Sequence, residues 1–350
     1  MWRTPGQPLK NMIIVLKPGL SNQLEKTILA EIRKRGYRPH VMRGVARTVI
    51  GAIGDELTHS SLESLVLEFP QAVESVNPIQ KRYKLVSREA HPANSTLTVR
   101  GQVLGGKKFQ VMAGPCSVES EKQLLTTAVA VQAAGATILR GGAFKPRTSP
   151  YEFQGLGEAG LKLLAKARRE TGLPVITELL SEAHADLVAE YADIIQIGAR
   201  NSQNFQLLIA AARTGKPVLL KRGMSMKIEE WLLAGEYVLA NENPNLLFCE
   251  RGIRTFETYT RNTLDLSAIP IIKNESHCPI VIDPSQGAGR ADLVAALCKG
   301  AVAMGADALL VEVHPQPAQA MSDSAQQLSL EGFAKLMREL QPLIAAVGRE

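Results

Sequence analysis

The sequence predicts an α/β protein in which a small βαββαβ ferredoxin-like domain precedes a (β/α)₈ barrel. The barrel is predicted from eight apolar strand-like segments in the later part of the 350 residues, most of them separated by helical stretches. The smaller domain is predicted from the order of its strand and helix patterns. The alternative to the barrel is an open doubly wound sheet, which would gather its functional groups at one switch point. Polar or charged groups follow nearly every strand instead, and this favours the barrel.

Residues 1–88 carry the pattern of the smaller domain. The first helical segment has a Ser cap and a Gly stop, and the strand before it ends at a Pro-Gly turn. Domains of this kind often serve regulation or interaction, although a fold alone does not give a function. Strand patterns cover 11–19, 37–44, 46–55 and 71–79, and helical patterns cover 21–36 and 61–69.

Residues 89–108 are expected to complete a polar linker and to begin a hairpin in TLTVRGQVLGGKKFQVMAG, whose Gly-Gly turn leads into a longer apolar strand. The barrel is assigned to residues 109–350. Its strands are expected in FQVMAGP, ATILRGG, LPVITE, ADIIQIG, KPVLLKRG, LLFCERG, PIVIDPS and ALLVEVH. Helices such as EKQLLTTAVAVQAAG, EAGLKLLAKARRETG, SEAHADLVAEY and NFQLLIAAARTG alternate with these strands.

The composition is that of a soluble globular protein, with 45% apolar and 21% charged residues. No apolar run is long enough to span a bilayer, and the first residues lack the apolar core of a signal peptide, so neither a membrane partner nor secretion is expected. The four cysteines are too scattered for a disulfide framework, which favours reduced thiols in the cytoplasm. Basic residues are spread along the chain, and only 5% of residues are aromatic, so no nucleic-acid partner is expected despite the net charge of +6.

Cationic side chains follow several of the predicted barrel strands. In a barrel, the groups just past the strands point into one mouth. Several cations in one mouth favour a multiply anionic ligand, because charge-assisted hydrogen bonds to phosphate or carboxylate are strong. Two anionic substrates, or one with two anionic ends, are therefore expected. The cations are Arg140, Lys145, Arg147, Arg200, Lys221, Arg222 and Arg251.

A second set of residues near the strand ends contains a cysteine and two acids. Cys116 and Glu312 lie at the ends of the first and last barrel strands, and Asp323 lies in the loop after the last one. A thiolate with carboxylates suits a divalent transition metal. Two other interpretations stay open at this point. A lone cysteine is most often a small buried hydrophobe, and Asp323 could cap the following helix.

Long motifs run through the predicted barrel: AGPCSVES, LRGGAFKPRTSPYEFQGLG, IQIGARNSQNFQLL, LLKRGM, CERGIRTFE, VIDPSQGAGRADL, and VEVHPQP with the following MSD. Together they resemble the 3-deoxy-D-arabino-heptulosonate 7-phosphate (DAHP) synthases, in the branch with an N-terminal ferredoxin-like (ACT-like) domain. TVIGAIGD and KRYKLVSRE extend the resemblance to the N-terminal domain and the linker. The resemblance implies a transferase that condenses phosphoenolpyruvate with erythrose 4-phosphate and water and releases inorganic phosphate. This reaction is the first step of the shikimate pathway, which leads to chorismate and the aromatic amino acids.

The resemblance also implies roles for the cations. The positions that match the family's phosphoenolpyruvate-binding residues are Arg200, Lys221 and Arg251. Those that match residues between the two substrates are Arg140 and Lys145. Those that match the residues that bind the sugar phosphate are Arg147 and Thr148. Cations on both substrates would convert a two-substrate encounter into a near-attack geometry.

Three of the family's four metal-ligand positions are filled by Cys116, Glu312 and Asp323. The fourth should be a histidine after Asp-Pro-Ser, and here it is Gln286. A carboxamide offers only a carbonyl oxygen, which is a poorer ligand than imidazole for borderline metals. A divalent ion, Mn²⁺ or another transition metal, is therefore expected to bind loosely at Cys116, Gln286, Glu312 and Asp323. The alternative is a metal-free enzyme in which the Gln286 amide hydrogen-bonds to the substrate.

Two residues are expected to take part in the chemistry. Lys145 is the expected proton donor to the alkoxide that forms from the aldehyde, with a pKa lowered by the neighbouring arginines. Glu178 is expected to orient the attacking water. The other interpretation of Glu178 is a structural partner for a nearby arginine.

Two other functions stay open. A related 3-deoxy-octulosonate 8-phosphate synthase would use a longer sugar, but that family carries an Asn-containing segment where this chain has KPRTSP. A non-catalytic regulatory homologue is favoured by Gln286 and opposed by the joint presence of Cys116, Glu312, Asp323 and Lys145. The resemblance further implies a homotetramer, with an aromatic amino acid as candidate effector whose identity the sequence leaves open.

Overall fold

The computed structural model describes residues 11–43, 48–54, 62–78 and 82–350. They fall into two compact units. One contains the residues up to Asn94 together with Glu275–His277, and the other contains Ser95–Asn274 and Cys278–Glu350. No helix among the described residues is long and apolar enough to cross a membrane.

The described part of the N-terminal unit contains an antiparallel sheet of four strands in the order β2-β3-β1-β4. This is the arrangement expected for a βαββαβ module, so the predicted ferredoxin-like fold is confirmed. The second helix is shorter than predicted, and the predicted ends at residues 44, 46–47, 55, 61 and 79 lie outside the described residues. The elements are β1 (Asn11–Leu16), α1 (Asn22–Lys34), β2 (Tyr37–Arg43), β3 (Thr48–Gly54), α2 (Leu65–Glu68) and β4 (Val73–Pro78).

The alternating direction of the side chains along β1 explains how the core of this unit forms. Met12, Ile14 and Leu16 all point to one face, where they pack with Ile28 of α1 and Leu65 of α2. Strand periodicity therefore buries one face of the sheet under the helices. At the start of α1, the predicted cap is present, because the Ser21 hydroxyl accepts a hydrogen bond from the backbone N–H of Leu24.

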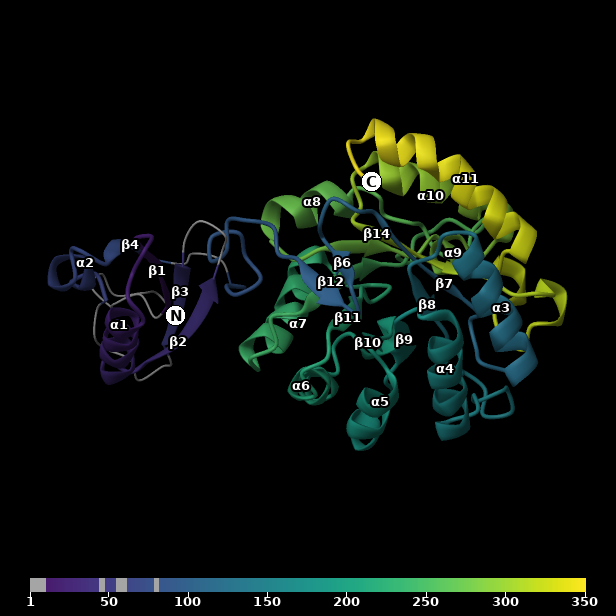
Figure 1. Cartoon of the computed structure of the whole chain (residues 1–350), viewed down its shortest axis with the longest axis horizontal. Coiled ribbons are helices and arrows are strands. Elements are labelled where there is room, and N and C mark those ends of the chain that lie inside the picture. The colour runs from purple at the N-terminus through teal and green to yellow at the C-terminus, as the bar shows by residue number, and fades with distance from the viewer. Residues whose placement is uncertain (1–10, 44–47, 55–61, 79–81) are drawn as a thin grey trace. The chain divides into compact units, whose positions relative to one another are not determined.

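In residues 82–350, eight parallel strands close into a barrel (Figure 1). Each of the eight predicted segments contains one of these strands, and the predicted barrel is confirmed. Their residues are nearly all buried, as expected where a parallel sheet is covered on both faces. The strands are β7 (Gln110–Gly114), β8 (Ile138–Arg140), β9 (Val175–Glu178), β10 (Ile194–Ile197), β11 (Val218–Lys221), β12 (Leu246–Glu250), β13 (Ile280–Ile282) and β14 (Ala308–Glu312).

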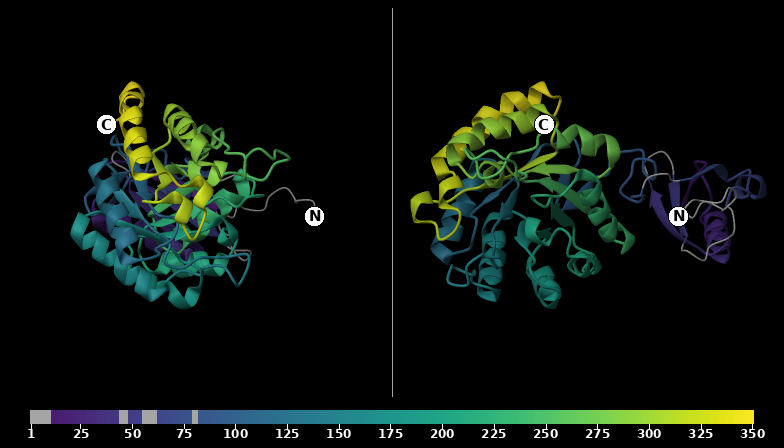
Figure 2. Two further views of the ribbon diagram at one scale, coloured as in Figure 1. Left: turned by 90° about the vertical axis from the view of Figure 1, so that its right-hand side faces the viewer. Right: turned by 180° about the vertical axis from the view of Figure 1, so that it is seen from behind.

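Helices surround the barrel, and α10 and α11 lie side by side on its outside (Figures 1 and 2). One predicted helix begins differently, since a 3₁₀ turn at Glu182–His184 precedes its α-helical part. The helices are α3 (Glu121–Ala133), α4 (Glu158–Thr171), α5 (Ala185–Tyr191), α6 (Phe205–Arg213), α7 (Ile228–Ala240), α8 (Ala268–Glu275), α9 (Pro284–Ala288), α10 (Ala291–Ala303) and α11 (Leu330–Ala346).

A hairpin closes the amino end of the barrel. Its strands are β5 (Leu97–Val99) and β6 (Gln102–Leu104), and its turn is at Arg100 and Gly101, both with positive φ. The prediction of a Gly-Gly turn is wrong, because that pair follows β6 on the way to β7. Leu97, Val99 and Leu104 join the apolar core inside the barrel. The Gln110 side chain, at the start of β7, donates to the carbonyl of Val103. Because the hairpin occupies this end, the carboxyl ends of the strands are left for a ligand site.

Candidate functional site

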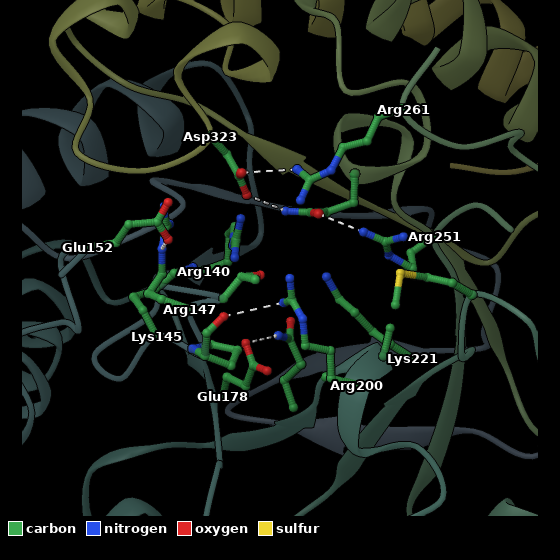
Figure 3. Close-up of a pocket in the computed structure, with 17 residues that line it drawn as sticks. Arg140, Lys145, Arg147, Glu152, Glu178, Arg200, Lys221, Arg251, Arg261 and Asp323 are labelled. Atoms are coloured by element: carbon green, nitrogen blue, oxygen red, sulfur yellow. Dashed lines mark hydrogen bonds and ion pairs between the residues drawn. The ribbon is translucent and has the colours of Figure 1, made fainter. Parts of the chain in front are cut away.

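A cavity of about 310 Å³ lies at the carboxyl ends of the barrel strands. Figure 3 shows the labelled cations directed into it. Ten of the thirteen residues predicted to form the site line this cavity, and two more, Cys116 and Glu312, are bonded to lining residues. The prediction for Arg222 is wrong, because its guanidinium does not line the cavity and pairs with Glu250 and Asp265. The lining residues are Arg140, Lys145, Pro146, Arg147, Thr148, Glu152, Glu178, Gln196, Gly198, Ala199, Arg200, Lys221, Met224, Arg251, Arg261, Gln286 and Asp323.

One side of the cavity is built by cations from the ends of β11 and β12. Lys221 donates to Asp283 across 2.6 Å, and both side chains are buried. Arg251 uses Nη2 to donate to Oε1 of Gln286 at 2.8 Å, whereas its buried Nη1 has no hydrogen-bond partner among the described residues. Burial lowers the pKa of Arg251. A buried guanidinium with an unused N–H is costly without an acceptor, so this side of the cavity is suited to an anion.

The opposite side is formed by the loop after β8, which contains the KPRTSP motif. Nε of Arg147 donates to Glu152 at 2.8 Å, and this bond raises the pKa of Arg147. Nη1 of Arg200 reaches across to the carbonyl of Pro146 at 3.3 Å. The sequence did not indicate Glu152 as a site residue, because a single acid in an irregular loop has no recognisable pattern. An anion that binds Arg147 has to compete with this carboxylate.

Cys116, Glu312 and Asp323 place their ligand atoms within 4.8 Å of one another. Cys116 and Glu312 are completely buried, and the Cys116 thiol donates to Oδ2 of Asp323 at 3.4 Å. Asp323 precedes a 3₁₀ turn but makes no capping hydrogen bond with its side chain, so the capping interpretation is wrong. A sulfur and two carboxylates within this distance fit the ligand preferences of a divalent transition metal.

Charges around this cluster set the protonation of its members. Burial and the Glu312 carboxylate raise the pKa of Cys116 to about 12, so without a metal the group is a neutral thiol at pH 7. Burial alone would raise the pKa of Asp323, but Arg261 and the Gln286 amide hold it well below its usual range. The cluster therefore contains an ionised aspartate next to a protonated thiol, and a metal has to displace the thiol proton.

Lys145 lies against this cluster rather than among arginines alone. Its Nζ donates to Sγ of Cys116 at 3.0 Å and to the carbonyl of Cys116 at 3.1 Å. Burial lowers the pKa of Lys145, but the nearby Cys116 and Glu178 outweigh burial and the net shift is upward. The predicted lowering of this pKa is therefore wrong. At Gly142, a Cβ would lie 3.0 Å from Cδ of Lys145, so the glycine leaves room for this side chain.

Glu178 ends β9 and accepts a hydrogen bond from the Gln196 amide at 3.2 Å. Among the described residues, the hydrogen-bond partner of the Glu178 carboxylate is this amide and not an arginine. A Cβ at Gly198 would lie only 1.9 Å from Oε1 of Glu178, so the carboxylate occupies space that only glycine leaves open. Gln196 was missed, although a polar residue within the apolar run ADIIQIG was a usable signal.

Gln286 lies between the cation side and the acid cluster. Its backbone N–H is fixed by the carboxylate of Asp283, which caps α9. Its side-chain Nε2 donates to Oε1 of Glu312 at 3.1 Å and to Oδ2 of Asp323 at 2.8 Å, and its Oε1 accepts from Arg251 (Figure 3). In this orientation the amide nitrogen faces the acids. An amide nitrogen has no lone pair to offer a metal.

Arg261 and Gln326 complete the cluster and were both missed from the sequence. Nη1 of Arg261 donates to Oδ1 of Asp323 at 3.0 Å and to Gln326 at 3.2 Å, and Gln326 donates to Oε2 of Glu312 at 2.7 Å. Both residues lie outside regular strands, in the loops after β12 and β14, where periodicity gives no information on side-chain direction.

A hydrogen-bonded group outside the cavity fixes the Asp323 loop. His314 accepts from the backbone N–H of Gln316 at Nδ1, so its Nε2 carries the proton that is donated to Glu119. Glu119 also accepts from the backbone N–H of Met321 at 2.9 Å. Asp323 itself has a φ of 49°, a left-handed conformation that is uncommon for residues other than glycine, although aspartate tolerates it better than most.

Comparisons with known proteins agree with this architecture. The family model for the DAHP synthetase I family matches residues 90–346, and the model for the DAHP synthase ferredoxin-like domain matches residues 12–81. A phospho-2-dehydro-3-deoxyheptonate aldolase of Thermotoga maritima is 49% identical over 339 residues, which is 96% of this chain and 99% of the relative. A 2-dehydro-3-deoxyphosphooctonate aldolase of Syntrophotalea carbinolica is 32% identical over 72% of this chain and 97% of the relative.

Solved structures also resemble this chain, including two from Thermotoga maritima. The crystal structure of the Thermotoga maritima phospho-2-dehydro-3-deoxyheptonate aldolase (DAHP synthase) aligns with a TM-score of 0.77 and 48% identity, covering 97% of this chain and 99% of that one. A truncated form of the Thermotoga maritima synthase aligns with a TM-score of 0.72 and 48% identity over 77% of this chain and 98% of its own.

Proposed function

The chain belongs to the DAHP synthetase I family, and from this premise we propose that it is a 3-deoxy-7-phosphoheptulonate synthase. It condenses phosphoenolpyruvate with erythrose 4-phosphate and water to give 3-deoxy-D-arabino-heptulosonate 7-phosphate and phosphate, the first step of the shikimate pathway. The N-terminal domain favours this activity over octulosonate synthesis, because the heptonate relative covers 96% of this chain and the octonate relative covers 72%.

One observation carries the proposal: cations stand on two sides of a single cavity, with a buried lysine and an acid cluster between them. Such a cavity suits two phosphorylated substrates that meet at its centre. The proposed grip on phosphoenolpyruvate uses Arg200, Lys221 and Arg251, with Arg140 and Lys145 between the substrates, and the proposed clamp on the sugar phosphate uses Arg147 and Thr148.

The proposed metal ligands are Cys116, Glu312 and Asp323, with Gln286 as a weak fourth ligand through its oxygen. A divalent transition metal bound there supplies Lewis-acid polarisation of the aldehyde. Mn²⁺ is the proposed ion, and its binding is loose because a carboxamide is a poorer donor than the imidazole of the family pattern. The cytoplasm is the proposed location, since Cys116 has to remain a free thiol to bind an ion.

The residues of the chain provide the proton transfers. C3 of phosphoenolpyruvate attacks the aldehyde carbon, and Lys145, which keeps its proton because its pKa is raised, donates to the aldehyde oxygen as that oxygen gains charge. Glu178 orients the water that adds at C2 and accepts its proton. Loss of phosphate from C2 then gives the keto product. Arg200, Lys221 and Arg251 hold the phosphoenolpyruvate throughout and exclude other orientations.

Residues 1–88 are proposed to form a regulatory domain that binds an aromatic amino acid, joined through residues 89–108 to the catalytic barrel at 109–350. The proposed assembly is a homotetramer. The family match to a ferredoxin-like domain at residues 12–81 supports the separate role of this part of the chain.

Substrate choice tests the proposal. Phosphate release is measured with Mn²⁺ and phosphoenolpyruvate, adding either erythrose 4-phosphate or a five-carbon sugar phosphate. Release with the four-carbon sugar supports the proposal, and release with only the five-carbon sugar assigns the octulosonate activity. No release with either sugar under any divalent metal assigns a non-catalytic homologue.

A further inference from the structure

We propose that Gln286 couples the two halves of the cavity, so that a cation at the acid cluster and an anion at Arg251 each strengthen the binding of the other. The inference rests on the proposed function only in taking a divalent metal and phosphoenolpyruvate as the two ligands. Its basis is the position of one amide, whose oxygen contacts Arg251 and whose nitrogen contacts Glu312 and Asp323.

The hydrogen-bond partners allow this amide only one orientation in the absence of ligands. A guanidinium has donors and no acceptor, and an ionised carboxylate has acceptors and no donor. Turning the Gln286 amide around would place its NH₂ against the Arg251 N–H groups and its oxygen against two acids. The orientation is thus set by its neighbours. In this orientation Gln286 presents no lone pair to the acid cluster, so it does not assist a metal.

Only one of the two terminal nitrogens of Arg251 is hydrogen-bonded in this state. Nη2 is held by Gln286 at 2.8 Å, and the buried Nη1 has no partner among the described residues. Carboxylates and phosphates prefer to bind a guanidinium through two parallel N–H groups. An anion that binds both Nη1 and Nη2 has to take Nη2 from the oxygen of Gln286. Anion binding therefore removes the contact that fixed the amide.

A released amide can turn its oxygen toward Cys116, Glu312 and Asp323, where a bound cation favours an oxygen donor and disfavours the N–H groups. The converse also holds, because a cation that draws this oxygen inward leaves Nη2 of Arg251 in need of an acceptor. Coupling between two binding sites is reciprocal by thermodynamic necessity. Gln286 is thus a positioning residue that links the acid cluster, the proposed metal site, to the anion site at Arg251.

Simple attraction between a cation and an anion also couples the two sites, so the test has to isolate the contribution of the amide. Mn²⁺ is titrated into the metal-free, full-length protein, and free Mn²⁺ is followed by its electron paramagnetic resonance signal. Each titration is done with and without saturating phosphoenolpyruvate, and erythrose 4-phosphate is omitted so that no turnover occurs. The quantity compared is the ratio of the two Mn²⁺ dissociation constants.

The wild-type ratio is expected to lie in the range of roughly 5- to 150-fold that is usual for coupled sites. In Gln286→Leu, which cannot bond to either side, the ratio should fall several-fold to the part due to charge attraction. In Gln286→His, Mn²⁺ should bind more tightly without phosphoenolpyruvate, and the ratio should also fall, because a ligating imidazole has no oxygen to exchange with Arg251.

Gln326→Leu is the matched control. Gln326 also donates its amide to Glu312, at 2.7 Å, but its oxygen accepts from Arg261 and not from Arg251. This variant should change the Mn²⁺ dissociation constant by the same factor with and without phosphoenolpyruvate. The ratio of the two constants should therefore stay at the wild-type value. A wild-type ratio retained in both Gln286 variants would overturn the proposal. Because no product is formed in these titrations, the result is independent of whether the catalytic proposal holds.

Discussion

Nζ of Lys145 lies 3.0 Å from Sγ of Cys116, so the proposed proton donor is in direct contact with a proposed metal ligand. The charged groups around this contact explain why a buried lysine keeps its proton. Burial favours the neutral amine, but Cys116 and Glu178 favour the ammonium, and the pKa of Lys145 is raised. A lysine that stays protonated in this position is suited to donate a proton and poorly suited to accept one from a substrate.

Lys145→Ala is therefore expected to reduce turnover by roughly 10²- to 10⁴-fold, the usual loss for a positioned acid. Lys145→Arg should not restore it, because guanidinium retains its proton and has a different shape. The phosphoenolpyruvate dissociation constant should change much less than kcat. Lys162→Ala, an exposed lysine of α4, serves as the control. Turnover near the wild-type value in Lys145→Ala would remove the residue from the mechanism.

Gly198→Ala tests the role of Glu178 without changing the acid itself. The added Cβ would stand 1.9 Å from Oε1 of Glu178 and has to push the carboxylate away from its bond with Gln196. If Glu178 orients the attacking water, kcat should fall by about 10-fold or more, because small displacements of a positioning group are costly. Glu178→Gln should show a comparable fall. Unchanged kcat in both variants would leave Glu178 a structural role.

His277 should make the protein less stable as the pH falls. Burial lowers its pKa from 6.5 to about 4, and its Nε2 lies 2.8 Å from the carbonyl of Leu85. Between these values the unfolded chain binds more protons than the folded one, so the free energy of unfolding decreases as the pH falls from about 6.5 to about 4. The full effect is about 3 kcal/mol.

Urea denaturation of the wild type and of His277→Gln at several pH values across this window checks the expectation. Glutamine keeps a hydrogen-bond donor for Leu85 but does not titrate, so the variant should lose less stability over the same range. Parallel pH dependence in the two proteins would show that another group is responsible.

The regulatory proposal is tested by removing the N-terminal domain. A chain that starts near Thr96 retains the hairpin, the barrel and every proposed site residue, and a truncated form of the Thermotoga synthase aligns over 77% of this chain. The shortened chain should keep kcat within a few-fold and lose inhibition by phenylalanine or tyrosine, since allosteric inhibition is a coupling between two sites. If the full-length enzyme responds to neither amino acid, the regulatory role fails.

The barrel could be predicted from the sequence because buried parallel strands appear as short apolar runs, and the groups that end them, such as Arg140 and Glu178, are fixed by strand position. Residues of irregular loops escaped prediction. Arg261, Glu152 and Gln326 reach the site through loop conformations that have no period.

Electrostatic details also escaped prediction. The direction of the Lys145 pKa shift depends on which neighbours are nearest, and the sequence suggested arginines where the structure places Cys116 in hydrogen-bond contact. The substitution at Gln286 was visible in the sequence. Its bonds to Arg251, Glu312 and Asp323 required the fold, because Gln286 follows β13 whereas its partners lie at the end of β14 or in the regions that follow β12 and β14.

Metal dependence is the central claim, and phosphate release from phosphoenolpyruvate and erythrose 4-phosphate by chelator-treated wild-type enzyme tests it most directly. After treatment with EDTA and dialysis into metal-free buffer, the enzyme should be inactive, and added Mn²⁺ should restore activity in a saturable manner. Loose binding at a site with one weak ligand predicts that dialysis alone removes much of the activity. Full activity in rigorously metal-free enzyme would contradict the account and would assign Gln286 to substrate binding.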